Sequence, residues 1–224
     1  MSYKVFLGNK AYSSWSLRGW LLFEAFGIPF HEEVVPLFTP AFERLRQEAS
    51  PARTVPMLRV EGEAEPLVMW DSLAIAEFLH ERHPDAGIWP ADPVARAAAR
   101  SLAAEMHAGF GELRSTMPMN LKRRYTSFQP NTEAMADIER ATVLWRWAKS
   151  RWGADGPYLF GEDFTASDAF FVPVASRFRT YGVGLDALCA AYAEALLAHP
   201  ATRRFTEDAN AEDWVIEAVE LEID

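Results

Sequence analysis

The sequence predicts two domains: a small α/β domain with a mixed sheet, followed by an all-helical domain. Strand and helix signals alternate over the first third of the chain, and helical patterns fill nearly everything beyond it. Between the two, closely spaced prolines and a glycine resist both helix and central strand. We therefore expect the first domain at 1–82, a linker at 83–92 and the helical domain at 93–224.

The α/β domain is predicted to run in the order β-α-β-α-β-β-α. The patterns predict strands at 3–8, 31–36, 56–60 and 67–70, and helices at 16–26, 40–49 and 73–82. The second strand is more polar than the first, which favours an edge position. The last two strands flank Glu61-Gly62-Glu63 and predict a hairpin, so the sheet should contain antiparallel as well as parallel pairs.

The second domain is predicted to contain long helices rich in Ala, Leu, Arg and Glu. Its predicted helices lie at 94–114, 133–152, 165–179 and 185–197, with a last turn near 202–210. Thr165-Ala166-Ser167-Asp168 stands just before an apolar run and predicts a capping box. The acidic tail from Glu212 is expected to be peripheral.

Composition narrows the class of protein. Half of the 224 residues are hydrophobic and 24% are charged, which is typical of a globular chain. A net charge of −10 disfavours nucleic acids and anionic membranes as partners. The first residues resemble neither a signal peptide nor a membrane span, so we expect a cytoplasmic protein. The single cysteine, Cys189, fits a reducing compartment and is expected to be a small buried hydrophobe.

The segment Tyr12-Ser13-Ser14-Trp15-Ser16 joins the first predicted strand to the first helix. Helix N-termini present free N–H groups and a partial positive charge, which stabilise an anion. A thiol with a pKa near 8.5 is mostly protonated at neutral pH, and the thiolate is the nucleophile. A serine hydroxyl here could stabilise a thiolate by donating to its sulfur. The alternative is that Ser13 or Ser14 merely caps the helix, and adjacent serines can serve both roles.

Two further features stand where a ligand could bind. Pro56 cannot donate to a sheet ladder and is expected at a strand start. A cis Val55–Pro56 bond would turn the Val55 backbone outward to pair with an extended peptide; a trans bond is the alternative. Ser72 suits a helix N-cap and a ligand carboxylate, and Asp71 suits an amino group, although plain capping would also explain the pair.

Together, these three features at this spacing resemble the glutathione S-transferase superfamily, and the resemblance covers nearly the whole chain. It implies a thioredoxin-like first domain, a cis bond before Pro56, glutathione as co-substrate, a homodimer and a role in detoxification. The run Ser13 to Arg18 is most similar to the zeta class, which includes maleylacetoacetate isomerases. Trp15 stands where that class has a cysteine, so isomerase activity is left open.

The resemblance also implies roles for individual residues. Ser13 would activate the glutathione sulfur, with Ser14 next in line. Glutathione would be held by Arg53, Val55, Pro56, Asp71 and Ser72. The second substrate, a small hydrophobic electrophile, would lie against Tyr12, Trp15, Met106, His107, Phe110 and Arg114. At helical spacing, Met106 and Phe110 can equally belong to the core.

Other chemistries find little support. His80-Glu81-Arg82-His83 is one residue short of a zinc-binding helix motif and has no third ligand in view, so no metal is expected. We also expect no nucleotide cofactor, because the chain has no glycine-rich dinucleotide fingerprint and no P-loop. Two functions remain: a serine-type glutathione transferase, or a non-catalytic binding module of the same fold.

Overall fold

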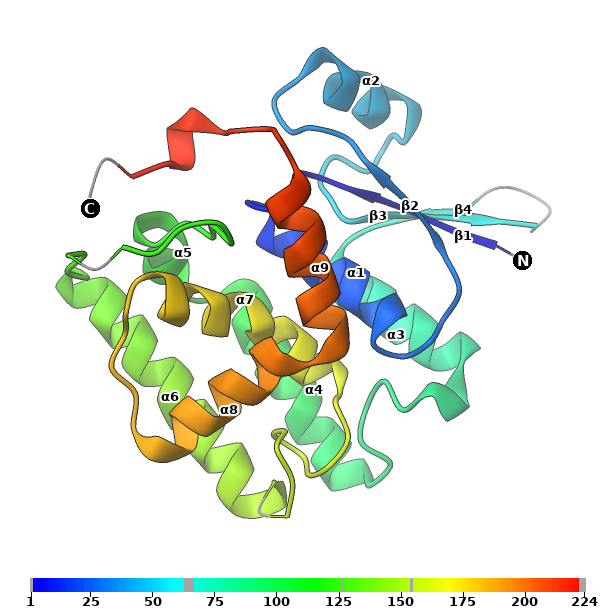
Figure 1. Cartoon of the computed structure of the whole chain (residues 1–224). Coiled ribbons are helices and arrows are strands. Elements are labelled where there is room, and N and C mark those ends of the chain that lie inside the picture. The colour runs from blue at the N-terminus through cyan, green and yellow to red at the C-terminus, as the bar shows by residue number, and fades with distance from the viewer. Residues whose placement is uncertain (1, 63–66, 126, 154, 222–224) are drawn as a thin grey trace.

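The structure, a computed structural model, describes residues 2–62, 67–125, 127–153 and 155–221 (Figure 1). The first part contains β1 (Ser2–Leu7), α1 (Ser14–Glu24), β2 (His31–Val34), α2 (Pro40–Glu48), β3 (Met57–Glu61), β4 (Leu67–Met69) and α3 (Ser72–Arg82). The rest contains α4 (Pro93–Ala108), α5 (Gly111–Thr116), α6 (Thr132–Trp152), α7 (Ala166–Thr180), α8 (Ala187–Ala198), α9 (Pro200–Ala211) and two short 3₁₀ turns, η1 (Pro84–Ala86) and η2 (Glu217–Val219). The predicted fold class is confirmed.

The sheet has the strand order β2-β1-β3-β4. β1 pairs parallel with β2 and antiparallel with β3, and β3 pairs antiparallel with β4. The sheet is therefore mixed, and the polar strand β2 lies at its edge, as predicted. The hairpin between β3 and β4 also forms, although Glu63 of its predicted turn lies outside the described residues.

Helices cover both faces of this sheet (Figure 1). α2 lies on one face, and α1 and α3 lie on the other, between the sheet and the helical part. Side chains alternate along β1 accordingly: Val5 and Leu7 join the large core shared with the helices, whereas Phe6 joins a smaller cluster under α2. The large core runs through both parts of the chain, which fixes the sheet against the helices.

The helix α7 passes through the centre of the helical part and is buried along almost its whole length. Its predicted capping box forms: the backbone N–H of Thr165 donates to the Asp168 carboxylate at 2.9 Å. The backbone N–H of Leu159 and the hydroxyl of Tyr192 donate to the same carboxylate at 3.1 and 2.9 Å. The buried carboxylate of Asp168 therefore connects α7 to α8 and to the loop that precedes α7.

The single long helix expected at 94–114 is wrong. α4 ends at Ala108, and α5 begins at Gly111 after a break in which Phe110 takes a left-handed conformation, with φ at 58°. At Gly109, a Cβ would lie 2.9 Å from the carbonyl oxygen of Glu105, so a side chain would crowd the last turn of α4. A glycine that permits this close approach is the local reason for the break.

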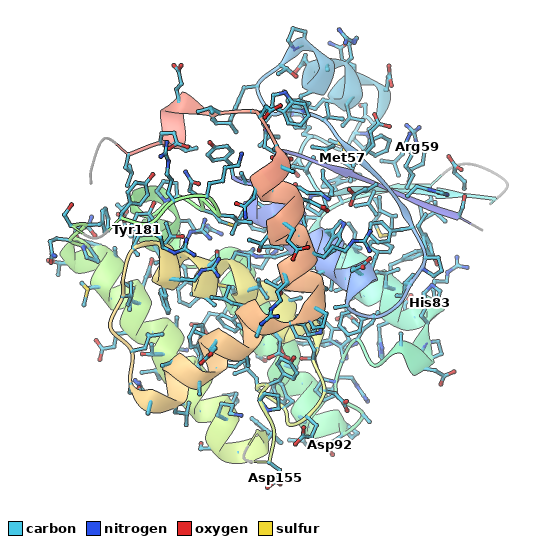
Figure 2. All side chains as sticks on the ribbon, viewed as in Figure 1. Met57, Arg59, His83, Asp92, Asp155 and Tyr181 are labelled. Atoms are coloured by element: carbon cyan, nitrogen blue, oxygen red, sulfur yellow. The ribbon has the colours of Figure 1, made fainter. Side chains whose placement is uncertain are left out.

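The linker expected at 83–92 joins α3 to α4. Figure 2 labels its two ends, His83 after α3 and Asp92 before α4. His83 lies 2.9 Å from the hydroxyl of Tyr3, and Asp92 caps α4 by accepting from the N–H of Ala95 at 2.8 Å. Both ends are thus anchored, while the exact domain boundary stays a prediction.

Two further expectations concern the single cysteine and membrane-spanning helices. Cys189 is buried and unpaired in α8, as expected, and burial raises the pKa of its thiol to about 11. Among the residues that the structure describes, no helix is long and apolar enough to cross a bilayer.

Candidate functional site

Strand register brings the three predicted ligand features to one edge of the sheet. Because β3 runs antiparallel to both β1 and β4, those two strands point the same way. Phe6 at the end of β1 pairs with Met57, the first residue of β3, and Met69 at the end of β4 pairs with Leu58. The start of α1, the Val55–Pro56 bond and the start of α3 therefore all lie at this edge.

Ser13 is the N-cap of α1, and its side chain accepts a hydrogen bond from the N–H of Ser16 at 3.2 Å. The capping alternative is thus realised. A hydroxyl has one proton to donate and two lone pairs, so capping leaves the Ser13 proton free to donate to a ligand. Ser14 is the first residue of the helix, and both serines are almost completely buried. The structure does not distinguish Ser13 from Ser14 as the residue that would contact the sulfur of glutathione.

The Val55–Pro56 bond is cis, as the resemblance implied. Pro56 packs directly on α1 at Gly19, where a Cβ would lie 2.4 Å from the proline Cγ. A side chain at this position would push the helix away from the proline, so Gly19, in the middle of α1, lets the helix pack closely on the start of β3. Sequence reasoning missed this role because a glycine within a helical pattern has many explanations.

The start of α3 differs from expectation in one respect. The N-cap is Asp71 rather than Ser72, since Asp71 Oδ1 accepts from the N–H of Leu73 at 3.1 Å. Ser72 is fully buried, and its hydroxyl has no hydrogen-bond partner among the described residues. A buried hydroxyl without a partner is unfavourable, and a ligand atom at this position would satisfy it.

A cluster between the two parts of the chain lies beside this edge. Asp71 Oδ2 is 3.1 Å from Nε2 of His107 on α4, and the His107 ring meets the Trp15 ring edge-to-face with centroids 5.0 Å apart. The Arg114 guanidinium lies 5.4 Å from the Trp15 ring and donates to the carbonyl of His107 at 3.2 Å. Trp15, His107 and Arg114, predicted to line one pocket, are therefore neighbours.

Met106 and Phe110 do not belong with them. Both are buried in the large core, and Phe110 follows the end of α4 instead of continuing it. Both residues therefore contribute to the core, and their place in the second-substrate pocket stays a prediction. Arg53 is exposed and has no ion-pair partner within the described ranges, so its predicted contact with glutathione stays a prediction.

The expectation of a peripheral acidic tail is wrong. Glu212, just after α9, accepts from the N–H groups of Lys10 and Ala11 at 2.8 and 3.2 Å. Lys10 is buried, and its ammonium lies 2.6 Å from Glu32 and 2.7 Å from Asp208 on α9. The loop that leads to Ser13 is therefore fastened by residues some 200 positions further along the chain.

Tyr12 is fastened by the same tail. Its hydroxyl donates to Glu220 at 2.6 Å, and Asn120 and Arg123 donate to the same carboxylate at 2.9 and 3.0 Å. Burial, together with this hydrogen bond, raises the pKa of Tyr12 to about 12, so the phenol is protonated at neutral pH. Tyr12 was predicted in the second-substrate pocket, and its hydroxyl is already occupied within the chain.

The sequence pattern did not indicate Glu212 or Glu220 as part of the site, because acidic residues after a last helix are usually solvated. No group of three or more metal-ligating side chains comes together in the part of the chain that the structure describes.

A thioredoxin-like domain with a cis-proline at the start of β3, joined to a helical domain that packs on α1 and α3, is the architecture of the glutathione S-transferases. Residues 12–82 match the family described as glutathione S-transferase, N-terminal domain. In fold and in this N-terminal segment, the chain is similar to the glutathione S-transferase superfamily.

Known relatives place the similarity near the zeta class, as expected. A probable maleylacetoacetate isomerase from Caenorhabditis elegans is 29% identical over 170 residues, covering 74% of this chain and 75% of the relative. A glutathione transferase homolog from Burkholderia gl BGR1, solved with bound glutathione, has a TM-score of 0.70 and 22% identity, covering 95% and 100% of the two chains. Maleylacetoacetate isomerase from Anaeromyxobacter dehalogenans with bound glutathione has a TM-score of 0.67 and 22% identity, covering 94% and 97%.

Proposed function

We propose that the protein is a serine-type glutathione transferase, in which Ser13 activates the thiolate of glutathione for attack on a small hydrophobic electrophile. Glutathione is the co-substrate, with Asp71 and Ser72 at its γ-glutamyl end and the Val55 backbone at its cysteinyl part. The thiolate sulfur attacks an electrophilic carbon of the second substrate. In a substitution the leaving group departs as an anion, and in an addition the new carbanion takes a proton from solvent.

The convergence of three elements at one sheet edge carries this proposal. The hydroxyl of Ser13 stands at a helix N-terminus, where both the helix and the hydroxyl proton favour an anion. The cis-proline and the unpartnered hydroxyl of Ser72 stand at the same edge. A binding module would need the peptide-binding groups only, so a hydroxyl poised for the sulfur favours an enzyme.

A second candidate is glutathione-dependent isomerisation of the maleylacetoacetate type, which the curated relative's name favours. In that reaction the thiolate would add to a double bond and leave again after bond rotation, so glutathione is regenerated. The two candidates differ in whether glutathione is consumed. Glutathione assays with a chlorodinitrobenzene-type electrophile and with a cis-diketo acid would separate them.

Ser72→Ala tests the glutathione site. Calorimetry should show that wild-type protein binds glutathione and that the variant binds about tenfold or more weakly, because a hydrogen bond to a charged carboxylate is lost. The same substitution should leave thermal stability unchanged or slightly raised, since the hydroxyl has no partner in the unliganded chain. A wild-type protein that neither binds immobilised glutathione nor turns over any electrophile would refute the proposed function.

We also propose a homodimer, as the resemblance implies. Apolar residues of α4 such as Leu102 and Met106 are buried in the core and are unavailable for the contact. Leu67 on the edge strand β4 and the adjacent Trp70 remain exposed. Light scattering at micromolar concentration should give about 50 kDa, twice the 25.2 kDa of one chain. A mass near that of one chain would contradict the dimer. Trp70→Ser should shift the equilibrium from dimer toward monomer.

A further inference from the structure

Arg18 is a buried charge without a partner. Its side chain on α1 is fully buried, and none of its three guanidinium nitrogens has a hydrogen-bond partner among the described residues. It also forms no ion pair within the described ranges. Buried charges in proteins are normally paired and hydrogen-bonded, because removal from water is costly. An arginine left in this state indicates an anion that the chain itself does not supply.

Aromatic rings and two further positively charged side chains surround Arg18. Its guanidinium carbon lies 4.4 Å from the Trp15 ring centroid and 5.6 Å from that of Phe170 on α7. Two further guanidiniums, Arg177 on α7 and Arg114 on α5, are close enough to repel it electrostatically. Burial, followed by these two neighbours, lowers the pKa of Arg18 to about 9, which leaves it charged at neutral pH.

The carboxylate of Asp71 does not neutralise this positive charge, because it is paired with His107. The ring of His107 also contacts that of Trp15. Arg177 is also buried, and it donates to the carbonyls of Met117 and Pro173, which satisfies hydrogen bonds without cancelling charge. The positive charges of Arg18 and Arg177 thus lie where water does not screen them, and the half-buried Arg114 adds a third charge nearby.

Side chains on a helix reach back over the turn that precedes them. The contact with Trp15 places the Arg18 guanidinium over the first turn of α1, whose N-cap is Ser13. The unpaired charge therefore lies behind the position where the proposed function puts the glutathione sulfur. Because Trp15 and Phe170 flank the guanidinium and Arg18 is fully buried, it acts across them instead of touching the ligand.

We propose that Arg18 is an electrostatic positioning residue whose buried positive charge stabilises the thiolate of glutathione held at Ser13. This inference rests on the proposed function. Two charges within about 10 Å interact by more than 1 kcal/mol at the effective dielectric of a protein, which corresponds to about one pKa unit of the thiol. Arg18 would add this effect to the hydrogen bond of Ser13 and the N-terminus of α1.

The test is a titration of bound glutathione, followed by the ultraviolet absorbance of its thiolate. In wild-type protein the thiol pKa should lie well below the value of about 8.5 for a free thiol. Arg18→Met should raise it by about one unit and lower turnover near pH 7 by up to about tenfold, with little change in glutathione affinity. Arg18→Lys, which keeps the charge, should recover most of the shift.

Arg140→Met is the matched control, because it removes an arginine that pairs with Glu105 on the surface. It should leave the thiol pKa unchanged, since solvent screens exposed charges. Arg18→Gln is a second neutral variant if Arg18→Met does not fold. Wild-type protein gives an independent measurement: the lowered thiol pKa should persist between about 0.05 and 1 M salt, because a buried charge is not screened.

An Arg18→Met or Arg18→Gln protein that folds, binds glutathione and keeps the wild-type thiol pKa would overturn the role of Arg18 alone. A wild-type shift that disappears at high salt would overturn it as well. A wild-type protein that binds glutathione with the thiol pKa of free glutathione would instead refute thiolate activation itself. The two failures are therefore distinguishable.

Discussion

Ser13→Ala should turn over electrophiles roughly tenfold to a hundredfold more slowly than wild-type protein near pH 7, with a much smaller change in glutathione affinity. The hydroxyl can donate to the sulfur while it caps α1, so its removal raises the thiol pKa toward the value in water. A hydrogen bond to a charged group is worth about 1.5–3 kcal/mol, or one to two pKa units. The defect should shrink as pH rises through the free thiol pKa, because solvent then supplies the thiolate. Steady-state kinetics across this pH range measures the effect.

The loss of a helix cap can imitate a catalytic defect, because Ser to Ala at an N-cap costs about 1 kcal/mol. Ser13→Gly is the matched variant: glycine at an N-cap costs only a few tenths of a kcal/mol, yet it also removes the hydroxyl. Both variants should therefore lose activity together while differing in thermal stability. Ser14→Ala should be milder. If Ser13→Ala keeps full activity and Ser14→Ala loses it, the two serines exchange roles; if neither loses it, serine activation is refuted.

Asp168→Ala should destabilise the protein by about 3–5 kcal/mol, because it leaves several buried donors without an acceptor at about 1–3 kcal/mol each. Burial raises the pKa of Asp168, and the four hydrogen bonds that it accepts oppose that shift. Removal of the carboxylate leaves the donors of Leu159, Thr165 and Tyr192 without an acceptor. Denaturant unfolding monitored by tryptophan fluorescence measures the change.

Asp163→Ala, five residues earlier on an exposed loop, is the control and should change stability by less than about 0.5 kcal/mol. A net rise in the pKa of Asp168 means that ionisation opposes folding. Its contribution to stability should therefore be greatest below the unfolded pKa of about 4 and fall as pH rises through the folded value. Equal stability of Asp168→Ala and wild-type protein would show that the network contributes little.

Much of the fold was predictable because local signals agree with the global structure. Thr165 and Asp168 form their capping box, the polar strand β2 takes the sheet edge, and the prolines separate α3 from α4. The order of elements follows from the switch between periods of two and 3.6 residues. These features depend on residues close together in sequence.

The parts that could not be predicted depend on distant contacts or on a single residue. The break after Ala108 results from one glycine within an otherwise helical pattern. Asp71 caps α3 in place of Ser72, and both residue types suit that position equally well. The pairing of Asp71 with His107 brings α3 and α4 together and leaves no periodic trace in the sequence.

The buried state of Arg18 illustrates the same limit. Its place in the Ser13 to Arg18 run was visible, but an arginine on a helix is ordinarily solvated, and only tertiary packing shows that all its nitrogens are enclosed. Met106 and Phe110 show the opposite case, in which helical spacing suggested a shared surface and packing made them core.

The hydrogen bonds from Lys10 and Ala11 to Glu212 affect the order in which parts of the protein can become structured during synthesis. The two sides of this contact are 202 positions apart, so the loop before Ser13 leaves the ribosome long before its partner exists. The strand pairings of the sheet lie within the first 82 residues and can form as the chain emerges, whereas the loop stays unsecured until Glu212, just after α9, is made. A nascent chain stalled before residue 200 should thus leave the loop before Ser13 unsecured, because Glu212 has not yet been made.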